Sequence, residues 1–158
     1  MTALALTSLA PDESELSPEG SLVIIRNAMD NKLKLEVQDG MYGVCRLPKG
    51  SPVPRWVEGK LTSVTRTDDE LSVVCQEDKI PGEIKCEKGW RAMKVLGPLD
   101  FSLVGVLASL AAPLAKAGIS IFAISTFETD YLLVKKENIE AAVKALTASG
   151  HTVVGKKK

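Results

Sequence analysis

The segment AGISIFAISTFETDYLLVKKENIEAAVKAL, residues 117–146, has the clearest secondary-structure pattern in the chain. Two apolar runs, residues 119–124 and 131–135, have the length and the β-branched content of strands. Between them, STFETD supplies three hydroxyls and two carboxylates, but none of the Gly, Asn or Pro residues that commonly form hairpin turns. This turn therefore either only joins the two strands or holds a ligand.

An amphipathic helix is predicted before this hairpin, over residues 101–118. Its apolar residues recur every three or four positions, which is the spacing of one helical face. Asp100 or Ser102 can cap its start, and Gly118 can end it in a left-handed conformation. The predicted buried face consists of Leu103, Leu107, Leu110 and Leu114.

A second amphipathic helix is predicted after the hairpin, over residues 137–150, with Asn138 as its cap. Strands over residues 91–97 and 151–154 complete the order β-α-β-β-α-β. This is the order of the ferredoxin-like fold, in which both helices cover one face of an antiparallel sheet. The fold class is therefore α+β.

The opposite face of the sheet is predicted to be buried as well. Ile119 and Ile121 can face the helices, yet Phe122 and Ile124 on the other side of the same strand are also apolar. A sheet that is apolar on both faces needs a cover on each. Another part of the chain should therefore pack on Phe122 and Ile124.

The N-terminal half has the features of a degenerate copy. Residues 33–47 contain two strand-like runs, and SVTRTDDELSVVC (63–75) aligns without gaps to residues 123–135 at an offset of 60. In this alignment Thr65 matches Ser125, and Glu70 takes the place of Asp130. Such a copy can supply the missing cover. GEIKCEKGWRAMKV (82–95) is predicted to be a hairpin that joins the halves, turning at Lys88–Gly89.

Composition excludes several classes of function. Lys plus Arg equals Asp plus Glu at 20 each, so there is no electrostatic reason to expect nucleic acid or an anionic membrane. No run approaches the roughly 20 apolar residues of a membrane span. The start of the chain lacks the basic flank of a secretory signal, which predicts a cytoplasmic protein.

The reactive side chains form no recognisable catalytic or metal-binding pattern. The spacing of Cys45, Cys75 and Cys86 matches no zinc motif, and His151 is the only histidine. Buried, inert thiols are the favoured interpretation. We therefore expect no cofactor, no metal and no enzymatic activity. An enzyme that uses paired carboxylates such as Asp68, Asp69 and Asp130 is the least favoured alternative.

The chain resembles the ACT-domain family of small-molecule regulatory modules. The resemblance is closest to tandem ACT proteins related to the regulatory region of aspartate kinases and to the CASTOR arginine sensors. Three segments support it: residues 95–146, YGVCRLP (42–48) and residues 63–75. The resemblance implies tandem ferredoxin-like (βαββαβ) ACT units and an amino acid bound where two units meet.

The resemblance also implies which residues hold that amino acid. In the family, backbone groups between the first strand and first helix hold the polar ends of the ligand, and the strand-turn-strand segment adds side chains. Pro98 departs from many ACT units because it removes one backbone donor. Arg66, in the first half, is a further candidate, although a surface ion pair is the commoner role for an Arg beside Asp-Asp. The implied ligand-binding residues are Leu99, Asp100, Phe101, Ser102, Leu103, Val104, Ser125, Thr126, Thr129, Asp130 and Arg66.

Two interpretations of the turn remain open at this point. A helix N-terminus suits the carboxylate of an amino acid, and Asp130 suits its ammonium group. Alternatively, Asp130 and the threonines only form the turn and cap backbone groups. In the second case the protein would be an ACT-like dimerisation or interaction protein without a ligand.

The expected domain organisation has four parts. Residues 1–32 are a flexible or partly ordered extension, residues 33–88 a degenerate ACT-like unit, residues 89–155 an ACT unit, and residues 156–158 a basic tail. The expected partners are a free amino acid and either further copies of the chain or a regulated protein.

Overall fold

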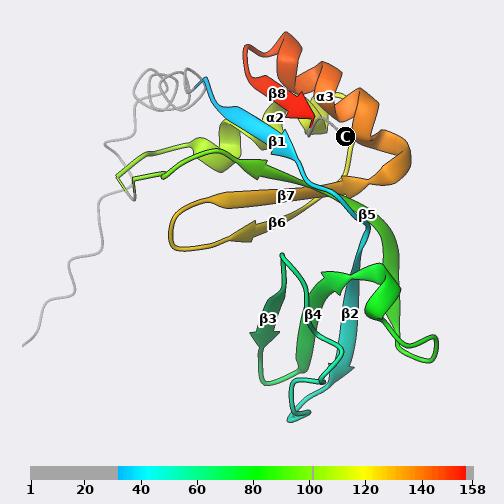
Figure 1. The fold of residues 1–158 in the computed structure, drawn as a ribbon. Helices are drawn as coiled ribbons and strands as arrows, with labels where there is room; N and C mark the ends of the chain where they lie inside the picture. Colours follow the sequence, from blue (N-terminus) through cyan, green and yellow to red (C-terminus); the bar gives the residue numbers. More distant parts are fainter. Residues whose placement is uncertain (1–31, 101, 156–158) are drawn as a thin grey trace, which may run out of the picture.

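The computed structural model describes residues 32–100 and 102–155. The predictions made for residues 1–31, for Phe101 and for residues 156–158 lie outside these described residues. Within them the protein is an α+β fold with eight strands and two α-helices (Figure 1). The predicted fold class is confirmed.

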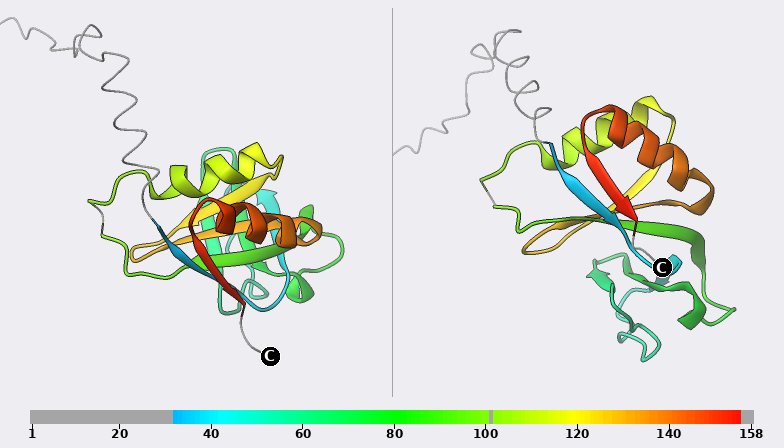
Figure 2. Two further views of the ribbon diagram at one scale, coloured as in Figure 1. Left: turned by 90° about the horizontal axis from the view of Figure 1, so that it is seen from above. Right: turned by 45° about the horizontal axis from the view of Figure 1, so that its top comes forward.

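The second half of the chain follows the predicted order β-α-β-β-α-β. Its elements are β5 (Cys86–Val95), α2 (Val106–Lys116), β6 (Ile121–Ser125), β7 (Asp130–Lys135), α3 (Ile139–Ala148) and β8 (Thr152–Gly155). A 3-10 turn, η3 (Lys136–Asn138), leads into α3. Both helices lie on one face of the sheet, as Figures 1 and 2 show.

The described part of the first half consists mainly of strands. These are β1 (Lys34–Val37), β2 (Tyr42–Pro48), β3 (Ser63–Arg66) and β4 (Glu70–Gln76), followed by a 3-10 turn, η2 (Glu77–Lys79). The predicted pair of strands in residues 33–47 and the predicted hairpin in residues 63–75 are confirmed. Between residues 32 and 83 the structure contains no α-helix.

The predicted hairpin over residues 82–95 is wrong, because residues 86–95 form one continuous strand. Gly89 has φ +81°, but it forms a bulge instead of a turn. Lys88 and Gly89 face the single residue Gly43 of β2 at a shift in register. An extra residue with a left-handed glycine is the usual form of such a bulge.

Strand β5 joins the two halves. Its first residues pair with β2, and its later residues pair with β1 and β7. β1 lies between β5 and β8, antiparallel to the first and parallel to the second. A strand from residues 34–37 is therefore an inner strand, which pairs on both sides with strands of the second half within one eight-stranded sheet.

The main core lies between the helices and this sheet. β1 contributes Leu35, β5 contributes Met93 and Val95, and the helices contribute Leu110 and Leu146, all fully buried. Met93 and Val95 are two positions apart and face the same core, because successive side chains of a strand point to opposite faces of the sheet.

A second core fills the space between the two halves and confirms the predicted cover. Ile124 and the partly buried Phe122 pack there with Tyr42, Leu61 and Val74 of the first half. The β2-β4-β3 strands therefore cover the face of the sheet that the helices leave bare (Figure 1).

Threonine closes the turn of both hairpins in the same way. The hydroxyl of Thr126 donates to the carbonyl of Thr129, and the hydroxyl of Thr67 donates to the carbonyl of Glu70. In each turn that carbonyl also accepts the backbone N–H of the threonine, at 2.8 and 2.9 Å. Thr67 and Thr126 are 59 residues apart, so the predicted offset of 60 is wrong by one residue.

Helix α2 begins later than predicted, at Val106. Gly105, with φ +80°, is its N-cap, and none of the described side chains caps the helix. Asp100 instead accepts the N–H of Ser102 in the preceding loop. The buried face is accordingly displaced from the predicted one and consists of Val106, Ser109, Leu110 and Leu114. Leu103 and Leu107 are exposed.

His151 connects the residue before β1 to α2 from a buried position. Its Nδ1 accepts the N–H of Leu33 at 3.2 Å, and its Nε2 lies 3.2 Å from the carbonyl oxygen of Ser109. Because Nδ1 is an acceptor here, Nε2 carries the proton and donates it to that carbonyl. Both ring nitrogens therefore contact the backbone.

Replacing Gly118 with valine should destabilise the protein by about 1–3 kcal/mol. Gly118 follows α2 with φ +71°, a conformation that is strained for a β-branched residue. Gly82→Val is a matched control, because a Cβ at either glycine meets nothing within 4 Å and only Gly118 has a positive φ. Urea unfolding should show a loss for Gly118→Val alone; equal stability of the two variants would contradict the role of Gly118.

Candidate functional site

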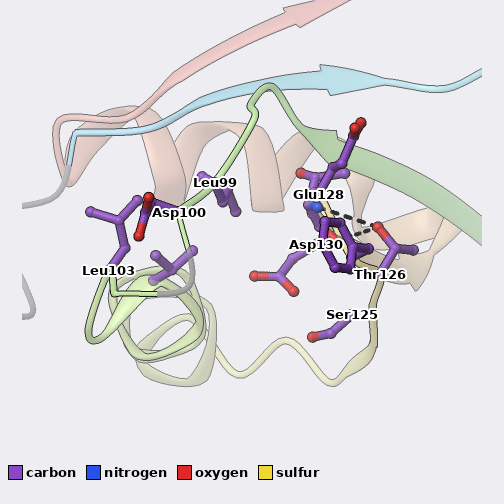
Figure 3. A pocket seen from close by; sticks show the side chains of 10 residues that line it. Leu99, Asp100, Leu103, Ser125, Thr126, Glu128 and Asp130 are labelled. Atoms are coloured by element: carbon purple, nitrogen blue, oxygen red, sulfur yellow. Dashed lines mark hydrogen bonds between the residues drawn. The ribbon is translucent and has the colours of Figure 1, made fainter.

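A small pocket lies between the β5–α2 loop and the β6–β7 turn (Figure 3). Its volume is about 190 Å³. The loop and α2 form one wall and the polar turn forms the other. The lining residues are Leu99, Asp100, Leu103, Val106, Ser125, Thr126, Phe127, Glu128, Thr129 and Asp130.

A backbone hydrogen bond joins the two walls. The N–H of Leu99 donates to the carbonyl of Glu128 at 2.8 Å. The approach is close at Gly97, where a Cβ would lie 2.7 Å from the nitrogen of Leu99 and 3.1 Å from the oxygen of Glu128. Because a side chain would not fit at these distances, position 97 must be glycine for the loop to lie against the turn. The bond between Gly97 and Pro98 is a cis peptide.

Two of the three hydroxyls in STFETD stabilise the turn itself. The hydroxyl of Thr126 donates to the carbonyl of Thr129 at 2.8 Å and accepts the N–H of Thr129 at 3.2 Å. The hydroxyl of Thr129 is buried and donates to the carbonyl of Val95, at the end of β5. These bonds replace the usual Gly, Asn or Pro of a tight turn. The structural role predicted as one alternative is therefore present for both threonines.

Ser125 and Asp130 face each other across the base of the hairpin as the last residue pair of β6 and β7. Figure 3 shows the hydroxyl of Ser125 and the carboxylate of Asp130 pointing from the strands toward the loop wall. Asp130 is only partly exposed. Asp100 lies on the opposite wall, and hydrogen bonds from Ser102 lower the pKa of its carboxyl. The pocket thus has a carboxylate on each side.

The structure brings together most of the residues implied by the resemblance. Ser102 and Val104 belong to the loop but do not line the pocket. Arg66 lies on the other hairpin, where it donates to the carbonyl of Ser51 at 2.9 Å. The residues found in the pocket are Leu99, Asp100, Leu103, Ser125, Thr126, Thr129 and Asp130.

Sequence analysis missed three residues of the pocket, namely Val106, Phe127 and Glu128. Val106 lines it because α2 begins at that residue, which the predicted start at residue 101 obscured. Phe127 and Glu128 occupy the tip of the turn, and Phe127 is 81% exposed. The sequence did contain a signal for Phe127, because an aromatic residue within an otherwise polar turn is unusual.

Within residues 32–100 and 102–155, no three side chains of His, Cys, Asp or Glu are grouped so that they can hold a metal ion. None of the helices in that part of the chain has the length and apolar content needed to cross a membrane.

Two family models match the chain. Residues 85–148 match a model described as an ACT domain. Residues 40–83 match a second model, which is described only as an N-terminal domain. The border between the two matches falls just before β5, the strand shared by both halves.

Two crystal structures show the same fold. An Agobacterium tumefaciens protein is 38% identical, with a TM-score of 0.77 over 81% of this chain and 96% of its own. The regulatory subunit of aspartate kinase from Thermus thermophilus has a TM-score of 0.52 at 12% identity, over 73% of this chain and 95% of its own.

Among curated proteins, the chain is similar to the human "Cytosolic arginine sensor for mTORC1 subunit 1". The two are 41% identical over 58 residues, which are 36% of this chain. The match spans only 18% of the length of the sensor.

Proposed function

Because residues 85–148 match an ACT-domain model, we propose that this chain is a non-catalytic regulatory module of that family that binds an amino acid. The ligand site is the pocket between the β5–α2 loop and the β6–β7 turn. The observation that supports this most is the pair Ser125 and Asp130, whose side chains point into a pocket built by the turn that the threonines close.

The size of the pocket favours a single small ligand. Pockets for drug-sized ligands have volumes of about 300–1,000 Å³. At about 190 Å³ the site is too small for a nucleotide and suits an amino acid.

The charge of the pocket favours a cationic or neutral amino acid over an acidic one. Three carboxylates line it, those of Asp100, Glu128 and Asp130. No Lys or Arg is among the lining residues in the described part of the chain. Asp130 would form a charge-assisted hydrogen bond with an ammonium or guanidinium group.

The start of α2 can accept the carboxylate of the same ligand. No side chain in the described part of the chain caps the helix, and Val106, its first residue, lines the pocket. The first N–H groups of a helix lack partners within the helix and carry a partial positive charge. One end of the pocket therefore suits a carboxylate and the other an ammonium group.

Exposed apolar side chains around the pocket favour a second chain as its cover. Leu103, Val104 and Phe127 are 45%, 70% and 81% exposed. Exposed apolar groups that gather at one place usually mark an interaction site. We propose that the ligand is bound where two ACT units meet, in a homo-oligomer or against a regulated partner protein.

The same apolar rim favours a second candidate function, an ACT-like dimerisation module without a ligand. In that case the threonines and Asp130 serve only the turn, and the rim alone is the functional surface. A cytoplasmic location and two ACT-like units, with residues 33–88 as the degenerate one, are part of either proposal.

A thermal-shift screen of the purified chain against the twenty amino acids distinguishes the two candidates. A ligand at about a hundred times its Kd should add roughly 2.7 kcal/mol of stability. We expect arginine, lysine or a neutral amino acid to raise the melting temperature, and aspartate and glutamate to have no effect. A flat screen, with melting that depends only on protein concentration, would favour the dimerisation module.

A further inference from the structure

We propose that Cys45 and Cys86 form a reversible disulfide that links β2 to β5. This site lies where β2 of the first half pairs with the start of β5, and it is independent of the proposed ligand pocket. It is the pair of thiols in the described chain whose positions suit a covalent bond.

The two cysteines are directly opposite each other in the antiparallel pair of β2 and β5. The N–H of Arg46 donates to the carbonyl of Lys85, so the neighbouring pair, Cys45 and Cys86, is of the type without mutual backbone hydrogen bonds. Such pairs have Cα atoms about 4.5 Å apart, within the range of about 4.4–6.8 Å that disulfides require.

The side chains already point toward one another. The sulfur atoms lie 2.8 Å apart, while a disulfide bond measures about 2.05 Å. Gly43 leaves room for this arrangement, because a Cβ there would lie 2.6 Å from the sulfur of Cys86. The third thiol, Cys75, is paired across the sheet with Gly43 and faces no cysteine in the register.

The two thiols differ in access to solvent. Cys45 is 1% exposed, whereas Cys86 is partly exposed at the start of β5. Burial, followed by the hydrogen bond with Cys86, raises the pKa of the Cys45 thiol. Burial also raises the pKa of Cys75, to about 11. Cys86 is therefore the thiol that an oxidant reaches first. Cys45 then attacks the mixed disulfide formed at Cys86.

The reaction with a disulfide oxidant such as oxidised glutathione has two steps. The thiolate of Cys86 attacks one sulfur of glutathione disulfide and expels one glutathione thiolate. Cys45 then loses its proton, attacks the sulfur of Cys86 and expels the second glutathione. The protein loses two electrons and two protons, and both are recovered in two molecules of reduced glutathione.

Oxidation of the full chain with glutathione disulfide tests this proposal. We expect the number of free thiols to fall from three to one, a mass loss of two hydrogen atoms, and a cross-linked peptide pair containing Cys45 and Cys86. Dithiothreitol should restore all three thiols. A link that involves Cys75, or three thiols that persist in the folded chain, would overturn the proposal.

Three variants separate the roles of the cysteines. Cys75→Ser should lose two thiols on oxidation, as the parent does. Cys45→Ser should stop at a glutathione adduct on Cys86, because the resolving thiol is missing, and Cys86→Ser should form no internal link. Adduct formation on Cys45 before Cys86 would contradict the proposed order of attack.

Discussion

Replacing Asp130 with alanine should weaken binding of the amino acid by about 2–5 kcal/mol, the usual cost when one partner is removed from a charge pair that the bound ligand buries. The carboxylate points into the pocket from the first residue of β7, and it lies opposite the wall that contains Asp100. Isothermal titration calorimetry with the amino acid found in the screen measures the change directly.

The fold of this variant should be intact, because Asp130 is a terminal residue of β7 and is partly exposed. Asp130→Asn keeps the shape of the side chain and removes its charge, so it should lose nearly as much affinity. Asp68→Ala is the control, since Asp68 lies in the turn of the other hairpin. Unchanged affinity in Asp130→Ala would remove Asp130 from the site.

The second half of the fold could be predicted from local patterns, because its elements are consecutive in the sequence. The spacing of apolar residues identified both helices. Gly118, with φ +71°, ends α2 as expected, and Gly150, with φ +92°, follows α3 in the same way. The start of α2 was predicted wrongly because Leu103 continues the helical spacing. The left-handed Gly105 is the N-cap instead, and Leu103 lies before the helix, where it lines the pocket.

The relation between the two hairpins could be predicted only approximately, because the two faces of a strand alternate at every residue. At an offset of 60, Val74 matches Val134, which packs against the helices. At the observed offset of 59, Val74 matches Leu133, and both lie in the core between the halves. With so few identical residues, the sequence alignment does not distinguish these two registers. The hydrogen bonds that Thr67 and Thr126 form in the two turns do distinguish them.

The insertion of β1 between β5 and β8 could not be predicted, since it depends on contacts between residues more than 50 positions apart. β1 has only four residues, and its pattern is compatible with either half. Leu35 pairs with Val95 on one side and Val153 on the other. The position of β1 is therefore determined by its two neighbouring strands, β5 and β8, which both belong to the second half.

Leu35→Ala should therefore destabilise the part of the chain that matches the ACT-domain model by about 2–5 kcal/mol, although Leu35 lies far outside residues 85–148. Its side chain is fully buried among Met93, Leu110 and Leu146, and its removal leaves a cavity in the helix-facing core. Urea unfolding followed by circular dichroism of α2 and α3 measures the loss, which is a large share of a typical stability of about 5–15 kcal/mol.

Leu107→Ala is the matched control for Leu35→Ala. The same side chain is removed, but Leu107 is 36% exposed on α2 and alanine is an excellent helix former, so the change should stay below about 1 kcal/mol. If both leucine variants unfolded at the same urea concentration, β1 would not be an inner strand of the sheet. A large loss for Leu35→Ala alone means that residues 85–148, which match the ACT-domain model, depend on a strand contributed by the first half of the chain.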